Sequence, residues 1–426
     1  MTDEVLTADA PPPQAGRQAA FGFIFASAIM NALSFGLMIP VLPALLKSFI
    51  GGDPSHATAS AALWQMVFAL SWGAVQFFSG PVLGLMSDRF GRRPVMLISI
   101  FGLSIDFVIM AFAPSLMWLF VGRLLNGLTA SSNSTAMAYV ADVTPPMDRA
   151  RRFGMMGSAF SVGFLLGPVV GGYLGEISLR LPFMVAAGMC LVNGIYGLFI
   201  LPESLPLARR VTRFVWSKAN PVASLGFLKA HGELMRLAMM FFLFQLSQTV
   251  WPMCFVLYSQ YRFHWSTGTI GMVMMISGAS GVVTQMWLVG PIVRRLGERR
   301  TLLVGAVCGA IGLAIYGWAP TAPLYFIGMP FSAFSGLMMP GIMGLMSRRV
   351  SGQEQGQLQG SNQSLQGLSS IVGPLVYGPT LAWAVANDAT LHLPGLPIFL
   401  SSGFIVLIFL LGLGVRRSEP IPAAAE

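Results

Sequence analysis

Two ionisable residues lie deep inside long apolar stretches of this 426-residue sequence and are its first candidates for chemistry. Asp106 lies about six residues, or about 9 Å along a helix, from the end of its stretch. Arg123 lies about seven residues, or about 10 Å, into the following stretch, measured from the same side. An ionised group is costly in apolar surroundings and usually serves a function there. The similar depths therefore predict that the two residues can pair.

Such a pair has two interpretations, which the residues alone leave open. In the first, it is a structural salt bridge between neighbouring helices. In the second, it is a proton-coupling site, where burial favours the neutral carboxyl group and Arg123 or a bound substrate opposes that shift. Asp142 and Glu176 are also acidic, but they lie near the ends of their stretches. Asp106 is thus the deep acid of the sequence.

The composition identifies the surroundings as lipid. Hydrophobic residues make up 55% of the chain and charged residues 10%, with a mean hydropathy of +0.71. Ordinary globular proteins contain roughly 25% charged residues, so this chain cannot cover the surface of a soluble fold. The same figures exclude intrinsic disorder, a coiled coil and a disulfide scaffold. The net charge of +9 raises nucleic acid as a partner, but the placement of the charges argues otherwise.

Twelve apolar runs are long enough to cross a bilayer, for which about 20 residues suffice. A β-barrel would show segments of about ten alternating residues instead. The predicted fold class is therefore an all-α integral membrane protein with twelve transmembrane helices. The predicted spans are 19–46, 58–84, 93–113, 116–141, 152–175, 181–201, 233–258, 267–289, 301–319, 322–346, 356–385 and 394–415.

The basic residues indicate the orientation of these spans. Of the 25 Lys and Arg, 21 fall in segments that share one side of the membrane when both termini are placed in the cytoplasm. The exceptions are Lys47, Arg180 and Arg262 in the opposite loops and Arg123 inside a span. Cytoplasmic loops carry an excess of Lys and Arg, so both termini are expected in the cytoplasm. This placement accounts for the positive charge, and no nucleic acid is expected as a partner.

The remaining reactive residue types form no catalytic or metal-binding pattern. Cys190, Cys254 and Cys308 fall in three different spans and include no CxxC pair, which indicates packing residues. The four histidines lie in loops or at helix ends. The sequence therefore predicts no enzyme activity, no metal site and no cofactor.

The chain repeats itself internally. Gly80-Pro81 after the second span recurs as Gly290-Pro291 after the eighth, 210 residues later, and Gly167-Pro168 recurs as Gly373-Pro374, 206 residues later. Two six-helix halves in the same orientation are predicted, with a substrate site near the midplane where they meet. The expected division is a disordered tail 1–18, an N-terminal half 19–201, a cytoplasmic linker 202–232, a C-terminal half 233–415 and a tail 416–426.

A charged motif follows the second span. Gly84-Leu85-Met86-Ser87-Asp88-Arg89-Phe90-Gly91-Arg92-Arg93 fits the pattern Gly-x-x-x-Asp-Arg-x-Gly-Arg-Arg and resembles the signature loop of the major facilitator superfamily. Glycines permit a tight turn, and the charges can pair with charges on neighbouring helix ends. The alternative is that the arginines only orient the membrane insertion. We expect Asp88 and Arg92 to form a conformational switch with Asp142, which ends the fourth span.

A glycine-rich motif occupies the fifth span. The run 157–172 is similar to the fifth-helix motif of drug–proton antiporters in that superfamily, and its alternative is ordinary helix packing. The resemblance points to efflux more than to uptake. The motif residues are Gly163, Gly167, Pro168, Gly171 and Gly172.

The resemblance narrows to the bacterial tetracycline–proton antiporters. Similar stretches run from Gly36-Leu37-Met38-Ile39-Pro40-Val41-Leu42-Pro43 to Gly356-Gln357-Leu358-Gln359-Gly360-Ser361, and include Tyr139-Val140-Ala141-Asp142 and Leu201-Pro202-Glu203-Ser204. That group carries aspartates in helices one and nine and a histidine in helix eight. This chain has Asn31, Gly309 and Gly281 there, which puts tetracycline itself in doubt as a substrate.

Polar residues on otherwise apolar helices are the predicted lining of the substrate cavity. Several of them, such as Gln245 and Gln248, share a helix face by their spacing. Their alternative role is hydrogen bonding between helices. An amide-rich cavity suits a lipophilic compound. The predicted residues are Asn31, Ser34, Asn126, Thr129, Asn133, Gln245, Gln248, Trp251, Asn362, Gln363 and Gln366.

The sequence thus predicts a proton-coupled exporter of small lipophilic, drug-like compounds that works by alternating access. Its expected location is the lipid bilayer of a bacterial inner membrane, as a monomer. A metabolite or sugar carrier of the same fold is the alternative, but it would call for more charged anchors in the cavity. A membrane enzyme would call for clustered acidic and histidine side chains at membrane depth.

Overall fold

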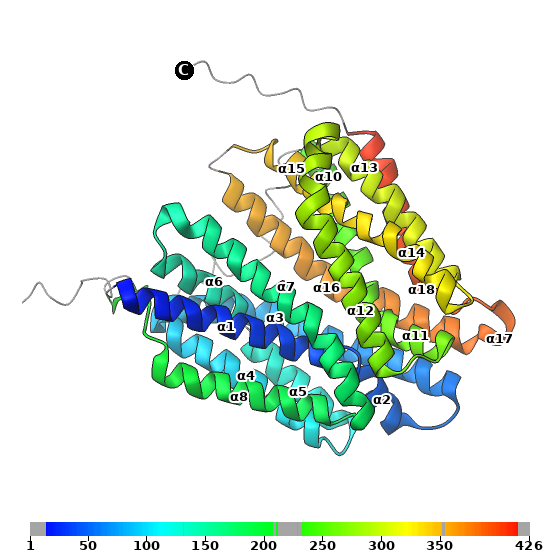
Figure 1. Ribbon diagram of the computed structural model, residues 1–426, viewed down its shortest axis with the longest axis horizontal. Helices are drawn as coiled ribbons and strands as arrows, with labels where there is room; N and C mark the ends of the chain where they lie inside the picture. The colour runs from blue at the N-terminus through cyan, green and yellow to red at the C-terminus, as the bar shows by residue number, and fades with distance from the viewer. Residues whose placement is uncertain are drawn as a thin grey trace, which may run out of the picture. The chain divides into compact units, whose positions relative to one another are not determined.

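The computed structural model describes residues 14–130, 132–207, 210–211, 228, 232–351 and 354–415. Within these ranges every regular element is a helix (Figure 1). Backbone groups in lipid must form their hydrogen bonds internally, which long apolar runs achieve as helices. The predicted all-α class is therefore confirmed.

The first six predicted spans correspond to the helices before residue 201. These helices are α1 (Gln14–Met38), α2 (Leu42–Ile50), α3 (Pro54–Phe90), α4 (Arg92–Phe112), α5 (Leu116–Thr129), α6 (Ser132–Val143), the 3₁₀ turn η1 (Pro146–Asp148), α7 (Arg149–Ile177) and α8 (Leu181–Ile200). The predicted tail 1–18 overlaps the start of α1, and its residues 1–13 lie outside the described part of the chain.

The last six predicted spans correspond to the helices after residue 232. These helices are α10 (Gly232–Gln248), the π turn η4 (Trp251–Phe255), α11 (Val256–Phe263), α12 (Thr267–Val283), the π turn η5 (Thr284–Leu288), α13 (Val289–Trp318), α14 (Ala322–Phe334), the 3₁₀ turn η6 (Ser335–Leu337), α15 (Met338–Ser347), α16 (Gln355–Ala386), α17 (Asp388–Leu391) and α18 (Leu396–Leu413). Most of the predicted linker and the tail 416–426 lie outside the described residues.

Ten helical stretches among the described residues are long and apolar enough to cross a membrane. One of them, Thr267–Trp318, covers two predicted spans, and the chain turns between these spans at Gly297, where φ is +73°. The predicted fourth span falls on two shorter helices, α5 and α6, since the first of them ends before Ala130. The ten stretches therefore cover eleven predicted spans, and α5 with α6 covers the remaining one.

The described chain packs into two compact units. The described residues of unit 1 are 14–49, 71–130, 132–207, 210–211 and 266–275, and those of unit 2 are 50–70, 228, 232–265, 276–351 and 354–415. The start of α3 thus packs in unit 2, and the start of α12 packs in unit 1. The units are therefore not the same residue sets as the predicted halves 19–201 and 233–415.

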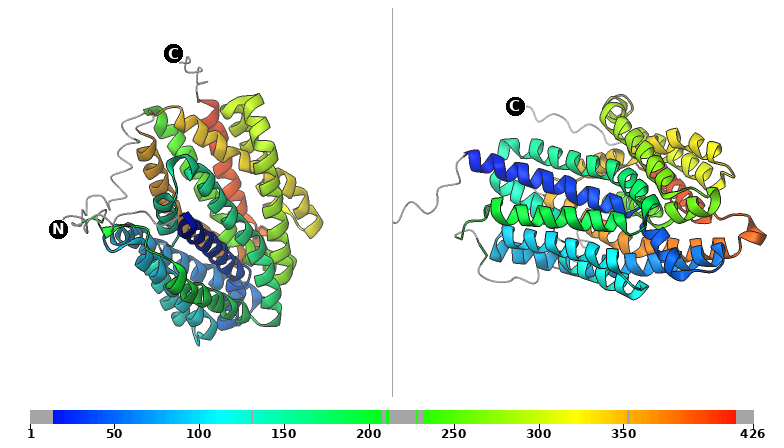
Figure 2. Two further views of the ribbon diagram at one scale, coloured as in Figure 1. Left: turned by 60° about the vertical axis from the view of Figure 1, so that its left-hand side comes forward. Right: turned by 60° about the horizontal axis from the view of Figure 1, so that its bottom comes forward.

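Unit 1 positions the charged residues of interest. Its helices run lengthwise against one another, with α1 along α7 and α4 along α8 (Figures 1 and 2). A buried cluster that includes Phe23, Ile24, Ile100 and Tyr139 fills the space among α1, α4, α6 and α7. Arg92 stands at the first position of α4, and Asp106 lies further along the same helix. One rigid helix therefore carries a residue of both candidate sites.

Candidate functional site

Asp106 and Arg123 form an ion pair inside unit 1. The Nη2 group of Arg123, on α5, donates a hydrogen bond to Oδ2 of Asp106, on α4. The same Nη2 lies 3.1 Å from the sulfur of Met110. Asp106 is 0% exposed and Arg123 5% exposed. Within the described part of the chain, Oδ1 of Asp106 and Nε of Arg123 have no hydrogen-bond partner.

Small residues allow this pair to form. A Cβ atom added at Gly122 would lie 2.8 Å from Oδ1 of Asp106, so the carboxylate occupies the space that a larger side chain would need. Ser104, two residues before Asp106, donates a hydrogen bond to the carbonyl of Ala187 and ties α4 to α8. The carboxylate is thus fixed on one side by Arg123 and retains one free oxygen that can accept a proton.

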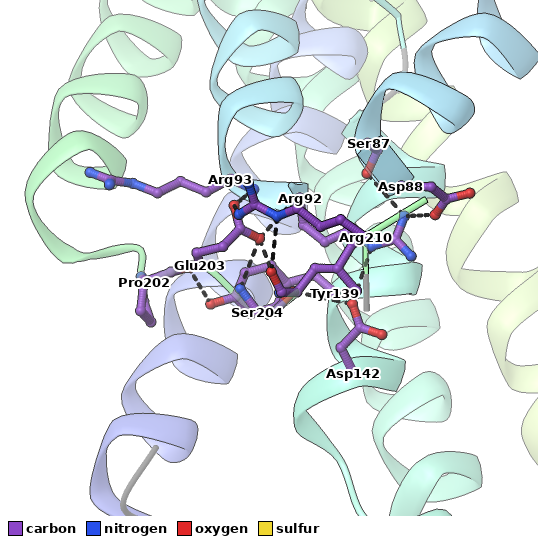
Figure 3. Close-up of polar contacts among 11 residues, drawn as sticks. Ser87, Asp88, Arg92, Arg93, Tyr139, Asp142, Pro202, Glu203, Ser204 and Arg210 are labelled. Atoms are coloured by element: carbon purple, nitrogen blue, oxygen red, sulfur yellow. Dashed lines mark hydrogen bonds and ion pairs between the residues drawn. The ribbon is translucent and has the colours of Figure 1, made fainter. Parts of the chain in front are cut away.

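A second group of charges lies where α3 ends and α4 begins (Figure 3). Arg92 Nη1 lies 2.6 Å from Asp88 Oδ1, and Arg92 Nε lies 3.1 Å from Asp142 Oδ2. Arg92 also donates a hydrogen bond of 3.0 Å to the hydroxyl of Ser87. We call Asp88, Arg92 and Asp142 the charge cluster. These are the three residues that the sequence places in the conformational switch.

The other residues of the 84–93 motif differ in how they contribute. Gly91 has a φ of +107°, which side-chain-bearing residues rarely adopt, so the sharp turn between α3 and α4 requires glycine. Arg93 donates a hydrogen bond of 2.6 Å to the carbonyl of Leu198, and the Arg89 guanidinium lies 5.4 Å from the Phe90 ring. A Cβ atom added at Gly84 would meet no atom within 4 Å.

Sequence reasoning assigned no role to four residues that lie beside the charge cluster. They are Tyr139, Glu203, Ser204 and Arg210, all drawn in Figure 3. Tyr139 donates a hydrogen bond of 2.8 Å to the carbonyl of Pro202, which holds the chain after α8 against α6. The available signal was the occurrence of Tyr139 and Glu203 in stretches that resemble the tetracycline antiporters.

The glycines of the predicted antiporter motif form two close helix contacts in unit 1. Gly163, Gly167 and Gly171 face α1, and a Cβ atom added at Gly167 would lie 2.5 Å from the Cα of Gly36. Gly172 faces the start of α12, where the hydroxyl of Thr267 donates to the Gly172 carbonyl at 2.9 Å. Pro168 lies within the same helix, next to α12. The motif therefore joins α7 to α1 and to α12.

Unit 2 repeats this arrangement on α16. A Cβ atom added at Gly373 would lie 2.7 Å from the Cβ of Thr249, directly after α10, and one at Gly378 would lie 2.6 Å from the Cβ of Met66 on α3. Gly378 follows Gly172 by 206 residues, the same offset as that between the two Gly-Pro pairs. The internal repeat thus extends from sequence to contacts.

The predicted cavity residues of unit 1 lie in different surroundings. Asn31 is half-buried, and its Oδ1 has no partner among the described residues. Ser34 is fully buried and lies 3.5 Å from the thiol of Cys190. Asn126 accepts a hydrogen bond of 2.7 Å from the indole of Trp72, while the Thr129 hydroxyl bonds to the backbone of its own helix. The side chain of Asn133 lies outside the described part of the structure.

The predicted cavity residues of unit 2 lie on α10, η4 and α16. Gln245, Gln248 and Trp251 are half-buried, and Trp251 opens the π turn η4 with its ring 5.5 Å from that of Tyr316. Asn362 is 4% exposed, and its Oδ1 has no partner among the described residues. Gln363 and Gln366 are exposed.

No group of three or more His, Cys, Asp or Glu side chains in the described ranges is arranged to hold a metal ion. The structure brings Asp106 into contact with Arg123, and Arg92 into contact with Asp88 and Asp142, as the sequence predicts.

Residues 24–374 match the model of the Major Facilitator Superfamily. The class C tetracycline resistance protein of Escherichia coli is 37% identical over 384 residues, which cover 88% of this chain and 94% of that protein. The class G protein of Vibrio anguillarum is 36% identical, with 87% and 94% covered. Multidrug resistance protein 2 of Bacillus subtilis is 27% identical, with 93% and 94% covered.

Solved structures share the fold at lower sequence identity. The human organic anion transporter MFSD10 has a TM-score of 0.67 and 22% identity, with 94% of this chain and 100% of that chain covered. The nucleoside transporter NupG has a TM-score of 0.73 and 14% identity, with 95% and 100% covered. The family match spans more than half of the chain and agrees with the motif of residues 84–93. The chain is therefore a multi-pass membrane transporter, not an enzyme, and belongs to the major facilitator superfamily.

Proposed function

We propose that this protein exports lipophilic, drug-like compounds in exchange for protons. Tetracycline resistance and multidrug resistance proteins are similar to it over most of their length, which supports drug efflux. The half-buried amides Gln245 and Gln248 and the ring of Trp251 suit an uncharged or weakly charged compound. The predicted site residues are contributed by helices of each unit.

The observation that carries the proposal is the state of Asp106. Its carboxylate is fully buried, one oxygen is bonded to Arg123 and the other has no partner among the described residues. A proton on the free Oδ1 leaves the hydrogen bond to Oδ2 in place but removes the charge that neutralises Arg123. The pair then carries a net positive charge in apolar surroundings, which is costly. Proton binding and release thereby favour different conformations of the helices around the pair.

The proposal also includes an orientation in the membrane and a state of assembly. The excess of Lys and Arg supports cytoplasmic termini in a bacterial inner membrane, with the charge cluster on the cytoplasmic side. The partners are then the lipid bilayer, a small lipophilic compound and protons. Nothing in the charge pattern requires nucleic acid, and we expect the protein to act as a monomer.

The test is transport in inverted membrane vesicles with an imposed pH gradient, with ethidium as the lipophilic probe. Asp106→Asn keeps the size of the side chain and one acceptor oxygen for Arg123 but removes the charge, so some folded protein should be lost. The protein that still folds and reaches the membrane should show no gradient-driven ethidium uptake when the rate is divided by its amount. Asp88→Asn is the matched control, because the same change outside the buried pair should slow transport without uncoupling it. Normal transport by Asp106→Asn, with normal dissipation of the pH gradient, would overturn the assignment.

A further inference from the structure

The carboxylate of Glu203 binds the start of a helix that lies 111 residues earlier in the chain. Its Oε1 accepts hydrogen bonds from the backbone amides of Arg92 at 2.8 Å, Ser204 at 3.0 Å and Leu205 at 3.1 Å. Its Oε2 accepts one from the amide of Arg93 at 3.3 Å and lies 3.7 Å from Nη2 of Arg210. Glu203 thus caps α4 at its first two positions (Figure 3).

This cap compensates for a local deficiency. The first amides of a helix have no partners within the helix, and they carry a partial positive charge that a carboxylate stabilises. The residue before α4 is Gly91, which has no side chain to supply the missing acceptor. A Cβ atom at Gly91 would overlap the Glu203 carboxylate. The glycine therefore leaves the space that Glu203 occupies.

The chain around Glu203 contacts every member of the charge cluster. Glu203 holds the backbone of Arg92, as described above. The hydroxyl of Ser204 donates to Asp142 Oδ2 at 3.2 Å, the same oxygen that Arg92 Nε contacts. The amide of Val211 donates to the carbonyl of Asp88 at 3.1 Å. The described residues of the 202–211 segment, 202–207 and 210–211, thus bridge the ends of α3, α4 and α6.

We propose that Glu203 is a positioning residue of the conformational switch and that residues 202–207 and 210–211 are a working part of it. Glu203 fixes the first turn of α4, and this turn sets where the Arg92 guanidinium can reach. Arg92 can then contact Asp88 and Asp142 together. The proposal rests on the transport function and on the charge cluster acting as its switch.

The first experiment measures whether Glu203 holds the segment, and it needs no substrate. Leu205 is 8% exposed, so a Leu205→Cys reporter in a Cys308→Ser background should react slowly with a maleimide in membrane vesicles. Adding Glu203→Gln removes the charge and should raise the labelling rate several-fold. Glu176→Gln is the matched control. Glu176 also caps a helix, because its Oε1 accepts a hydrogen bond of 3.2 Å from the amide of Gly268, and neither residue belongs to the segment. An unchanged labelling rate in Glu203→Gln would overturn the proposal.

The second experiment separates positioning from simple stabilisation. Ethidium transport is measured for Glu203→Gln, Asp142→Asn and the double variant, and each rate is divided by the amount of folded protein found by size-exclusion chromatography. We expect the turnover to fall several-fold in each single variant, with little change in KM, and the double variant to be no slower than the slower single variant. Residues that act on one contact are non-additive.

The outcomes of the two experiments are distinguishable. Multiplied losses in the double variant, or a loss that the folded amount fully explains, would show that Glu203 only stabilises the fold. If the wild type does not transport ethidium or any other lipophilic probe, the proposed function fails. The labelling rate still decides in that case whether Glu203 holds the 202–211 segment to α4.

Discussion

Two of the arginine–aspartate contacts in the described part of unit 1 differ in burial. Arg123 and Asp106 lie between α5 and α4 with side chains that are 6% and 0% exposed. Arg92 and Asp142 lie at the ends of α4 and α6 with side chains that are 14% and 26% exposed. Arg92 has a further acidic partner in Asp88 and a hydroxyl partner in Ser87, whereas one oxygen of Asp106 is unpaired within the described residues.

The difference in burial changes how much free energy it costs to break each contact. An exposed ion pair is worth about 0.2–1 kcal/mol, so thermal motion or a small conformational bias can break it. Removing one partner of a buried pair costs about 3–5 kcal/mol, because the other charge is left uncompensated. The proposed function therefore assigns the opening and closing step to the charge cluster and the proton to the buried pair.

The largest expected effect is the loss of folded protein when the buried pair loses one partner. Arg123→Met keeps the length of the side chain but leaves Asp106 ionised and alone, at a cost of about 3–5 kcal/mol. The double variant Arg123→Met with Asp106→Asn removes both charges and should recover most of the folded protein, but not transport. Size-exclusion chromatography and thermal unfolding in detergent measure the amount and the stability of folded protein in the single and the double variant. Equal yields of the single and double variants would contradict the role of burial.

The second expected effect concerns a charged ligand. The charge of Asp106 is already neutralised by Arg123. By the resemblance described above, we expect Asn31, Gly309 and Gly281 to stand where the tetracycline antiporters carry acidic and imidazole side chains. In the structure Gly309 is packed, since an added Cβ atom would lie 3.0 Å from Ser335. Each lost charge-assisted contact costs about 1 kcal/mol, and about 1.4 kcal/mol lowers affinity tenfold.

Tetracycline is transported as a charged metal chelate. It should therefore bind to this protein about tens- to hundreds-fold more weakly than it binds to its dedicated exporters. The measurement is the tetracycline resistance of an efflux-deficient bacterial host, with the class C relative expressed as the positive control. A large rise in resistance that Asp106→Asn abolishes would show that Asn31 and its neighbours suffice.

A smaller effect is expected when a charge is removed from the exposed cluster. Asp88→Asn and Asp142→Asn each take away one partner of Arg92, and a loss of up to about 1 kcal/mol changes turnover by up to about fivefold. Substrate binding should remain unchanged, because these residues lie at helix ends. Ethidium binding and transport rates measured on the same vesicles test this. A parallel loss of binding in Asp88→Asn would indicate a binding role instead.

The smallest expected effect is the response to salt. Raising the ionic strength from 0.1 M to 1 M shortens the Debye length from about 10 Å to about 3 Å, which screens exposed charges much more than buried ones. The difference in turnover between the wild type and Asp88→Asn should therefore shrink by about twofold or less at high salt. The defect of Asp106→Asn should stay the same. If salt instead restores Asp106→Asn, then solvent reaches the buried pair.

Much of the fold was predictable because a membrane span has a simple requirement. A helix needs about 20 apolar residues, and this chain provides runs of that length between charged or Gly-Pro breaks. The charged segment around Gly297 separates two predicted spans, and the chain turns there. One detail was not predicted, namely that the fourth span divides after Thr129 into α5 and α6 beside the polar run 131–135. Hydropathy averaged over a span of about 20 residues does not resolve such a short polar run.

The candidate sites were predictable to different extents. Asp88 and Arg92 are four residues apart at the end of α3 and the start of α4, so the motif alone brings them together. Asp106 and Arg123 are 17 residues apart on consecutive helices, and their similar depths are enough to predict contact. Glu203 is 111 residues from Arg92 and binds its backbone amide. Backbone partners have no signature in side-chain chemistry, so no spacing rule could find this contact.

By itself the sequence determined the membrane location, the helical class, the internal repeat and the residues that carry charge into the apolar layer. These properties depend on the polarity and order of residues, which lipid selects directly. Tertiary structure alone decided that Ser34 contacts Cys190, that Asn126 bonds to Trp72 and that Glu203 caps α4. Each of these contacts joins segments that are 54 or more residues apart in the chain. Their geometry depends on how the helices pack, because a polar side chain in an apolar layer takes the nearest partner that packing offers.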